Sequence, residues 1–272
     1  MPVIPQIKPP IFLGGAGRSG TTLLRVILDS HPNIACGPEL KVIPTLANLW
    51  HQFHTSFFQT LQSYHLTRGE INQLFTNVML TLFEKYRRSQ GKHRIAEKSP
   101  NNVFFFQHLH NLFPDSPLVH VIRDGRDVVC SLLTMDWADA VSGKPFDYTR
   151  DAGKAAEYWS NAVRAGRQML EEESKRDRYT EIRYEDIVIN PEKTLKELFT
   201  FLEEPWDPIV LKYHEQKRDL AGESSASNVS LPLYDSALGR WQRDLKSKDK
   251  DAVKVVAGDL LIELDYAADN DW

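Results

Sequence analysis

A glycine-rich run near the N-terminus has the spacing of a phosphate-binding loop but lacks the lysine of that loop. Gly15 and Gly20 occupy the two glycine positions of G-x-x-x-x-G-K-[ST], and Thr21-Thr22 replaces the last two residues. In nucleoside triphosphatases the lysine contacts the outer phosphates and the hydroxyl group binds magnesium. The sequence therefore predicts a site for a phosphate or sulfate ester that is handled without magnesium. Arg18 is the cation that the loop itself supplies.

The segments that flank this run explain how it would hold an anion. The apolar residues 11–13 come before the glycines, and helical periodicity follows them. Backbone N–H groups at a helix N-terminus have no partner within the helix, and the helix dipole favours negative charge there. A glycine-rich turn after a strand would alone be weak evidence for an anion-binding site. Here the whole strand-loop-helix pattern is present.

Two further clusters carry groups that could take part in a transfer reaction, and each follows a predicted strand. Glu39 lies in Cys36-Gly-Pro-Glu-Leu-Lys-Val-Ile-Pro44, where a partly buried carboxylate could act as a general base. Lys98 lies in Ala96-Glu-Lys-Ser-Pro-Asn101 and could stabilise charge on a leaving oxygen. The simpler alternatives are a helix-capping glutamate and an exposed lysine.

A third cluster, Val121-Ile-Arg-Asp-Gly-Arg-Asp-Val-Val-Cys-Ser131, could hold a second phosphate. Arg123 ends the predicted strand and Ser131 lies about two turns into the next helix, so one phosphate could contact both side chains. The alternative is an ion-pair network on the surface formed by the arginines and aspartates of this segment, which would contribute little to stability.

Composition limits the classes of partner. The 272 residues carry a net charge of −4, which disfavours a broad nucleic-acid-binding surface. The two cysteines are too few for a disulfide framework. We find neither a signal peptide nor a long apolar run, so we expect a cytoplasmic protein that does not bind a membrane. The histidine pairs lack cysteine or carboxylate neighbours at ligand spacing, so we expect no metal.

Short apolar runs alternate with helical periodicity along the chain. The runs are 11–13, 34–36, 94–96, 118–122 and 179–183. This alternation predicts an α/β fold, with a P-loop-containing central parallel sheet flanked by helices and the ligand beyond the carboxyl ends of the strands. We expect a single domain over 1–272 with a helical insertion at about 42–92. Asn190 is expected to cap a helix that begins at Pro191, and 215–230 is expected to be a loop.

Taken together, the four clusters resemble the sulfotransferases that use 3'-phosphoadenosine-5'-phosphosulfate (PAPS), and most of all the tyrosylprotein sulfotransferases. Two motifs carry the resemblance: GAGRSGTTLLRVILDSHPNIACGPELKVIP and VIRDGRDVVCS. It implies that PAPS is the co-substrate and 3'-phosphoadenosine-5'-phosphate (PAP) the product, with Glu39 as the base and Lys98 and Arg18 as the other catalytic groups. The residues implied to bind the nucleotide are Gly17, Arg18, Ser19, Gly20, Thr21, Thr22, Arg123, Ser131 and Tyr184.

The chain also departs from this family pattern. Lys41 stands where the tyrosylprotein enzymes have an arginine that helps to hold acidic peptides, and lysine loses the bidentate geometry. Cys36 matches a cysteine that is disulfide-bonded in secretory members, but Ala96 occupies the partner position. The late serine-rich segment lacks a family basic residue, which leaves Ser225, Ser227 or Arg240 as candidates for the 3' side of the nucleotide.

These observations predict a sulfotransferase that moves a sulfuryl group in line to a hydroxyl, with the phenol of a tyrosine or natural product as one class of acceptor. An aliphatic alcohol or a sugar hydroxyl is the alternative acceptor. A P-loop phosphotransferase, disfavoured by Thr21, and a non-catalytic nucleotide-binding module, disfavoured by Glu39 and Lys98, are the alternatives from other classes. The oligomeric state stays open, with a homodimer as one arrangement.

Overall fold

Five parallel strands form a sheet at the centre of the protein. The computed structural model describes residues 8–139, 142–216 and 224–272, without the side chains of 227 and 228. The strands are β1 (Ile11–Gly14), β2 (Ile34–Cys36), β3 (Arg94–Lys98), β4 (Leu118–Ile122) and β5 (Tyr179–Arg183), in the order β2-β3-β1-β4-β5. All of their pairings are parallel. The predicted strands are confirmed, and β3 continues two residues further than expected, to Lys98.

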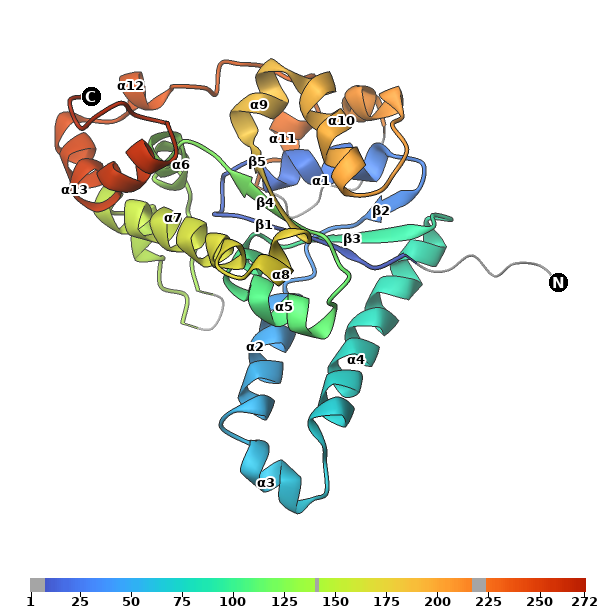
Figure 1. Ribbon diagram of the computed structural model, residues 1–272. Coiled ribbons are helices and arrows are strands. Elements are labelled where there is room, and N and C mark those ends of the chain that lie inside the picture. Colours follow the sequence, from blue (N-terminus) through green and yellow to red (C-terminus); the bar gives the residue numbers. More distant parts are fainter. Residues whose placement is uncertain (1–7, 140–141, 217–223) are drawn as a thin grey trace.

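Helices cover both faces of the sheet (Figure 1), as a parallel sheet requires. One face carries α1 (Thr21–Ser30), α9 (Tyr184–Ile189), α10 (Pro191–Phe201) and α11 (Ala226–Val229). The other carries α5 (Phe106–Leu112), α6 (Gly125–Leu132) and α7 (Ala152–Arg167), with α12 (Trp241–Asp244) and α13 (Ser247–Glu263) packed against them. Shorter helical segments are α8 (Glu173–Arg176), η1 (Pro100–Phe105), η2 (Asp147–Thr149), η3 (Gln168–Leu170) and η4 (Pro208–Glu215). The predicted α/β class is confirmed.

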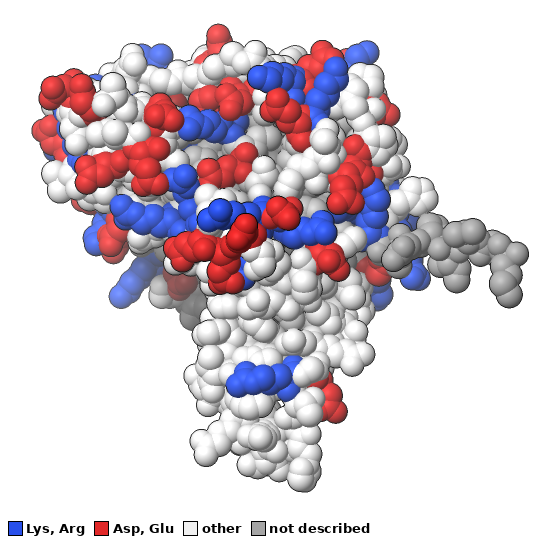
Figure 2. All heavy atoms as spheres, viewed as in Figure 1, with Lys and Arg blue, Asp and Glu red and all other residues white. Residues whose placement is uncertain are grey.

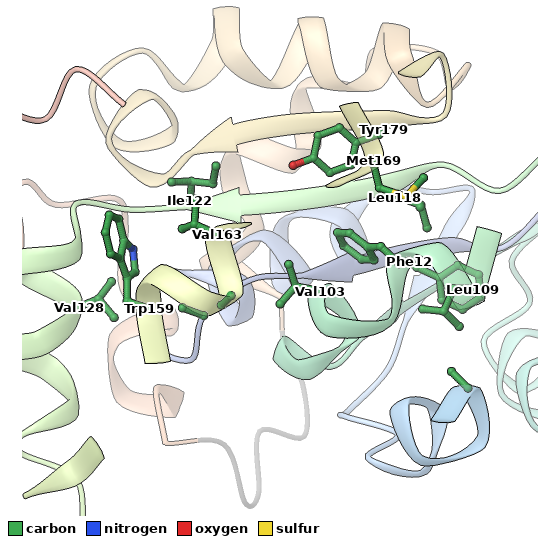
Figure 3. Close-up of a cluster of buried hydrophobic side chains, with 14 of the residues drawn as sticks. Phe12, Val103, Leu109, Leu118, Ile122, Val128, Trp159, Val163, Met169 and Tyr179 are labelled. Atoms are coloured by element: carbon green, nitrogen blue, oxygen red, sulfur yellow. The ribbon is translucent and has the colours of Figure 1, made fainter. Parts of the chain in front are cut away.

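Strand β1 shows how the sequence builds a core on each side of the sheet. Successive side chains of a strand point to opposite faces. Ile11 and Leu13 pack into the cluster that includes α1 and α10. Phe12 packs into the other cluster, together with Val103 and Trp159 (Figure 3). The continuous apolar run is therefore what a strand buried on both faces needs.

The helical insertion forms an arm that projects from the body (Figure 1). It consists of α2 (Val42–His54), α3 (Phe58–Ser63) and α4 (Arg68–Ser89). A capping box between Thr67 and Glu70 begins α4. Figure 2 shows few charged side chains on the visible face of the arm. Because α2 begins directly after the turn that carries Glu39, the base of the arm borders the candidate site.

Two local expectations need correction. Asn190 occupies the N-cap position of α10, which begins at Pro191 as expected, but its side chain makes no capping hydrogen bond. It also ends α9, where its backbone N–H donates to the carbonyl of Asp186. The segment 215–230, expected to be a loop, contains the short helix α11. Residues 217–223 of this segment lie outside the residues that the structure describes. In the described ranges, no helix has the length and apolarity that crossing a membrane requires.

Candidate active site

The glycine-rich run connects β1 to α1, as the sequence predicts. Gly20 precedes α1 with φ 96°, a backbone conformation that favours glycine. A Cβ atom at this position would lie 2.4 Å from Cδ2 of Tyr184. Gly20 is thus needed both for the turn and for the close approach of the Tyr184 ring, which comes from the start of α9.

Arg18 connects the loop to two distant segments. Its Nε donates to Ser131 Oγ on α6, and its Nη1 donates to Ser225 Oγ just before α11, each at 2.9 Å. Arg18 has φ 74°, which is uncommon for a residue with a side chain. Ser131 and Ser225 are therefore brought to the loop by the side chain predicted to bind the anion.

Arg123 and Arg240 lie close enough to Arg18 to affect its titration. Burial lowers the pKa of the Arg18 guanidinium, and the positive charges of Arg123 and then Arg240 lower it further. The Arg123 guanidinium lies 4.5 Å from the centre of the Tyr184 ring and 3.6 Å from Asp127. Crowded positive charge in a partly buried place favours a bound anion.

A buried polar atom in this cluster supports an anion site. Nε of Arg123 has no hydrogen-bond partner among the residues that the structure describes. Arg123 is 6% exposed and lines the cavity described below, and a buried polar atom without a partner carries a desolvation cost. The residues present therefore fit a ligand with phosphate or sulfate oxygens.

The sequence left open that the arginines and aspartates of residues 121–131 form only a surface ion-pair network. Ion pairs do form here, but they are buried. Arg126 and Asp124 form a pair at 2.8 Å, and the Arg126 guanidinium lies 4.0 Å from the centre of the Trp241 ring. These side chains are buried and hold α6 against α12. Arg123 also pairs with Asp127, at 3.6 Å, and in addition lines the cavity described below.

Glu39 and Lys98 form the second cluster. Nζ of Lys98 lies 2.5 Å from Glu39 Oε1 and 3.3 Å from Thr22 Oγ1. The Lys98 side chain is fully buried at the end of β3, whereas 25% of the Glu39 side chain is exposed. The structure thus brings together the predicted base, the predicted lysine and the first turn of α1.

A buried glutamate beside this cluster escaped the sequence reasoning. Glu97 accepts hydrogen bonds from Leu40 N (3.3 Å), Ser99 Oγ (2.8 Å) and Asn102 Nδ2 (2.5 Å). Burial raises the pKa of Glu97 to about 7, against the lowering effect of these hydrogen bonds. An acidic residue within a buried strand was the signal that could have identified it.

One cavity of about 1260 Å³ connects the two clusters. Of the predicted residues, those that line it are Gly17, Arg18, Gly20, Thr21, Thr22, Glu39, Lys41, Arg123, Ser131, Tyr184, Ser225 and Arg240. Lys98 is not among the lining residues, and it contacts Glu39 and Thr22 from the end of β3. We call the part around Arg18, Arg123 and Tyr184 the donor half and the part beyond Glu39 and Lys41 the acceptor half, after the roles that the sequence predicts. Both halves belong to one continuous space.

Of the residues predicted to contact the nucleotide, Ser19 and Gly17 make other contacts, and the side chain of Ser227 is not among those that the structure describes. Ser19 is buried, and its backbone N–H donates to the carbonyl of Ala16 rather than into the cavity. The backbone N–H of Gly17 donates to Tyr158 Oη at 2.9 Å, because α7 brings that side chain against the loop. Tyr158 was not predicted, since nothing in a helical pattern marks such a contact. The side chain of Ser227 lies outside the described residues.

The two cysteines are buried and unbridged. The parallel register of β2 and β3 places Ala96 directly beside Cys36. Ala96 therefore occupies the position at which the family resemblance places the missing bridge partner. In residues 8–139, 142–216 and 224–272, no three histidine, cysteine, aspartate or glutamate side chains gather as a metal site would need.

The fold and site define an α/β protein with a lysine-free loop of the phosphate-binding type beside a cluster of arginines. Comparison with known proteins narrows this class. The family model described as "Sulfotransferase family" matches residues 9–208. The chain belongs to the sulfotransferase family.

Relatives and solved structures agree with this family. The chain is 29% identical over 241 residues to a protein-tyrosine sulfotransferase of Drosophila melanogaster, covering 86% of this chain and 47% of that protein. It is 31% identical over 243 residues to protein-tyrosine sulfotransferase A of Caenorhabditis elegans, covering 87% and 62%. It thus spans about half to two-thirds of the length of these relatives. The fold is similar to the sulfotransferase domain of the Synechococcus PCC 7002 olefin synthase, with TM-score 0.62, 22% identity and coverage of 93% and 96%.

Proposed function

We propose that the protein transfers a sulfuryl group from PAPS to the hydroxyl of a tyrosine or another phenol. The observation that carries this proposal is the single cavity that joins the arginine cluster to the Glu39–Lys98 pair. Membership of the sulfotransferase family supports the reaction class, and the names of the fly and worm relatives support a tyrosine acceptor.

The donor half of the cavity has groups for two anionic ends of the nucleotide. Arg123, with its Nε lacking a partner in the described part of the chain, would hold the 3'-phosphate together with Ser131. The amides at the start of α1 and the Arg18 side chain would hold the 5'-phosphosulfate. PAPS supplies the activated sulfuryl group when it is bound.

Residues on the other side of the loop would handle the proton and the developing charge. The bond between sulfur and the acceptor oxygen forms as the bond between sulfur and the phosphate oxygen breaks. Glu39 would take the proton of the acceptor hydroxyl. Lys98, held between Glu39 and Thr22, would stabilise charge on the departing oxygen. We draw the in-line geometry by analogy with phosphoryl transfer, in which positioning and electrostatics supply most of the rate acceleration.

The chemistry of the acceptor favours a phenol over an aliphatic alcohol. A phenol has a pKa of about 10, so it needs less help from a base than an alkyl alcohol does. The phosphotransferase alternative lacks its lysine because Thr21 replaces it. A module that only binds nucleotide has no need for a buried lysine paired with a glutamate in the same cavity.

An assay for a sulfated product tests this function. The protein is incubated with PAPS and a panel of tyrosine peptides, simple phenols, alkyl alcohols and sugars, and products are identified by mass spectrometry. We expect a mass gain of one sulfuryl group on phenolic acceptors and none with Glu39→Ala. PAP should also raise the melting temperature, whereas ATP with magnesium should not. Stabilisation by ATP and magnesium alone, or no sulfated product of any class, would contradict the proposal.

A further inference from the structure

A buried carboxylate on α6 holds a distant turn at two points. Oδ2 of Asp127 accepts the backbone N–H of Gly239 at 2.8 Å, and Oδ1 accepts that of Trp241 at 3.0 Å. The Asp127 side chain is 1% exposed. Gly239 has φ 64°, a left-handed backbone conformation that favours glycine. Asp127 therefore fixes the backbone on both sides of Arg240.

Two further contacts hold the same turn. Arg123, four residues before Asp127, donates from Nη2 to the carbonyl of Ala237, and this nitrogen lies 3.6 Å from Asp127 Oδ2. The indole of Trp241 is 8% exposed and meets the Trp272 ring edge-on, with ring centres 5.2 Å apart. The turn is thus held by two N–H groups, by a carbonyl group and by the packing of an indole.

The segment that ends in this turn forms a wall of the donor half. Arg123 belongs to the donor half and contacts the carbonyl of Ala237, so the segment borders that half. Arg240 lies close enough to Arg18 for its positive charge to lower the pKa of the Arg18 guanidinium. Asp127 is not among the residues that line the cavity. Those of the segment that do are Leu233, Tyr234, Ser236, Ala237 and Arg240.

We propose that Asp127 is a positioning residue for the nucleotide, which directs Arg240 toward the 3'-phosphate that Arg123 would hold. It does so through the N–H groups of Gly239 and Trp241. This inference rests on the proposed function, because it takes PAPS as the ligand of the donor half. A guanidinium binds phosphate oxygens well only in a suitable orientation, so the turn that carries it has to be fixed.

The charge of Asp127 sharpens the question. A carboxylate 3.6 Å from Arg123 offsets part of the positive charge that would attract a phosphate. If Asp127 acted through its charge alone, it would weaken the binding of the nucleotide. If it acts by positioning Arg240, it strengthens that binding. The two effects have opposite signs, so one measurement can separate them.

That measurement is the affinity of Asp127→Asn for PAP. Asparagine keeps the shape of the side chain and one acceptor oxygen, but its amide nitrogen cannot accept the second N–H. We expect the Kd for PAP in calorimetric titration to rise about threefold to tenfold, since one hydrogen bond to the turn is lost. The KM for PAPS should rise in parallel, with kcat changed less than twofold. Tighter or unchanged binding of PAP would overturn the proposal.

A double-variant cycle tests whether Asp127 acts through Arg240. Arg240→Met should raise the Kd for PAP about tenfold. In that background the positioning of residue 240 no longer matters and only the charge effect is left. Asp127→Asn should then leave the Kd unchanged or lower it. A second, additive loss of affinity would show that Asp127 does not act through Arg240.

Salt dependence gives a readout that a general loosening of the fold would not change. The Kd for PAP should rise with salt less steeply in Arg240→Met than in the wild type, because one cation is missing. Asp127→Asn should show the same shallower rise, although it removes a negative charge. A rise as steep as that of the wild type, or steeper, would contradict the loss of the Arg240 contact.

Two further variants guard against misfolding. The matched control is Asp207→Asn, because Asp207 also accepts a backbone N–H, that of Ile209 at 2.9 Å, but does not line the cavity. Its affinity for PAP should equal that of the wild type. Gly239→Val disturbs the turn and leaves Asp127 intact, since φ is 64° and no atom lies within 4 Å of an added Cβ. It should weaken PAP binding, and an unchanged Kd would argue against the proposal.

Failure of this inference can be told apart from failure of the proposed function. If PAP does not bind to the wild type, the proposed function loses its donor site and the inference falls with it. If PAP binds and a sulfated product forms, but Asp127→Asn binds PAP as tightly as the wild type, only the positioning role is wrong. The melting temperature without ligand shows in each variant whether the protein is folded.

Discussion

The buried Glu97 carboxylate accepts a hydrogen bond from the backbone N–H of Leu40, the residue that follows Glu39, at 3.3 Å. The next residue of β3, Lys98, contacts the Glu39 carboxylate itself. Two adjacent residues of one strand therefore hold both the backbone and the side chain of the turn that carries the proposed base. Glu97 is not among the residues that line the cavity, and we infer from its contact with Leu40 that it positions Glu39.

The first prediction concerns this positioning. Glu97→Ala should lower kcat about tenfold while the affinity for PAP stays near that of the wild type, because the turn loses its anchor and the donor half does not. Glu97→Gln keeps an oxygen that can accept the N–H of Leu40, so its kcat should fall less than that of Glu97→Ala. Steady-state kinetics and PAP titration measure both. The control is Glu181→Ala on β5, and equal kcat in Glu97→Ala and the wild type would argue against the role.

The second prediction is a pH dependence of stability. Burial raises the pKa of Glu97 from its ordinary value of about 4.5 to about 7 in the folded protein. The folded state therefore binds the proton more tightly, so the contribution of Glu97 to stability is fully present below about pH 4.5 and is lost as pH rises through 7. Urea unfolding between pH 4.5 and 8 should show this contribution. Glu97→Gln should flatten the profile over that window, and an unchanged slope would refute the assignment.

The third prediction separates chemistry from nucleotide binding. Glu39→Ala should lower kcat by about two to four orders of magnitude, the usual range for loss of a general base. PAP should bind almost as before, because Glu39 is not part of the arginine cluster. Single-turnover rates and calorimetric titration with PAP provide the two readouts. Turnover equal to the wild type would remove Glu39 from the role of base.

The fourth prediction concerns the donor half. Arg123→Met should weaken PAP binding about tenfold to a hundredfold, since hydrogen bonds to charged groups contribute about 1.5–3 kcal/mol. Binding of PAP to the wild type should also weaken as salt concentration rises. The control is Arg88→Met, because the Arg88 side chain is 73% exposed on α4. Unaltered PAP affinity in Arg123→Met would place the 3'-phosphate elsewhere.

The fifth prediction concerns Gly20. Gly20→Ala should destabilise the protein by about 1–3 kcal/mol and weaken nucleotide binding, because φ is 96° and the added Cβ would lie 2.4 Å from the Tyr184 ring. The Gly20→Ala/Tyr184→Ala double variant should lose less stability than the sum of the two single losses. Removing the Tyr184 ring relieves the steric conflict with the added Cβ, whereas the backbone strain at residue 20 stays. Denaturant unfolding of the single and double variants measures this. Full additivity of the two changes would contradict the contact.

Much of the fold and of the donor half could be predicted from local sequence patterns. The strands were short apolar runs, and the loop was a glycine pattern whose shape depends on backbone geometry. Glu39 and Lys98 were identifiable because each lies at or shortly after the end of a strand in a parallel sheet, where strand ends meet at one edge. Their contact across 59 residues of chain follows from that topology.

The acceptor half could not be predicted in this way. Trp137, Tyr148 and Tyr158 come from a connection and a helix whose sequences resemble any packed aromatic segment, and only the tertiary fold places their rings against Gly17. The contact of Arg18 with Ser225 likewise joins segments 207 residues apart. The cytoplasmic location and the homodimer stay predictions.

The register between β2 and β3 has a consequence for how this site could be lost. Cys36 lies beside Ala96. Glu39 comes three residues after Cys36, in the turn that follows β2, and Lys98 comes two residues after Ala96, at the end of β3. A slip of one residue between the strands would turn the lysine to the opposite face of the sheet. The register of two short strands therefore sets the distance between Glu39 and Lys98. Loss of the proposed sulfuryl transfer would reveal a shift of that register even where the overall shape is unchanged.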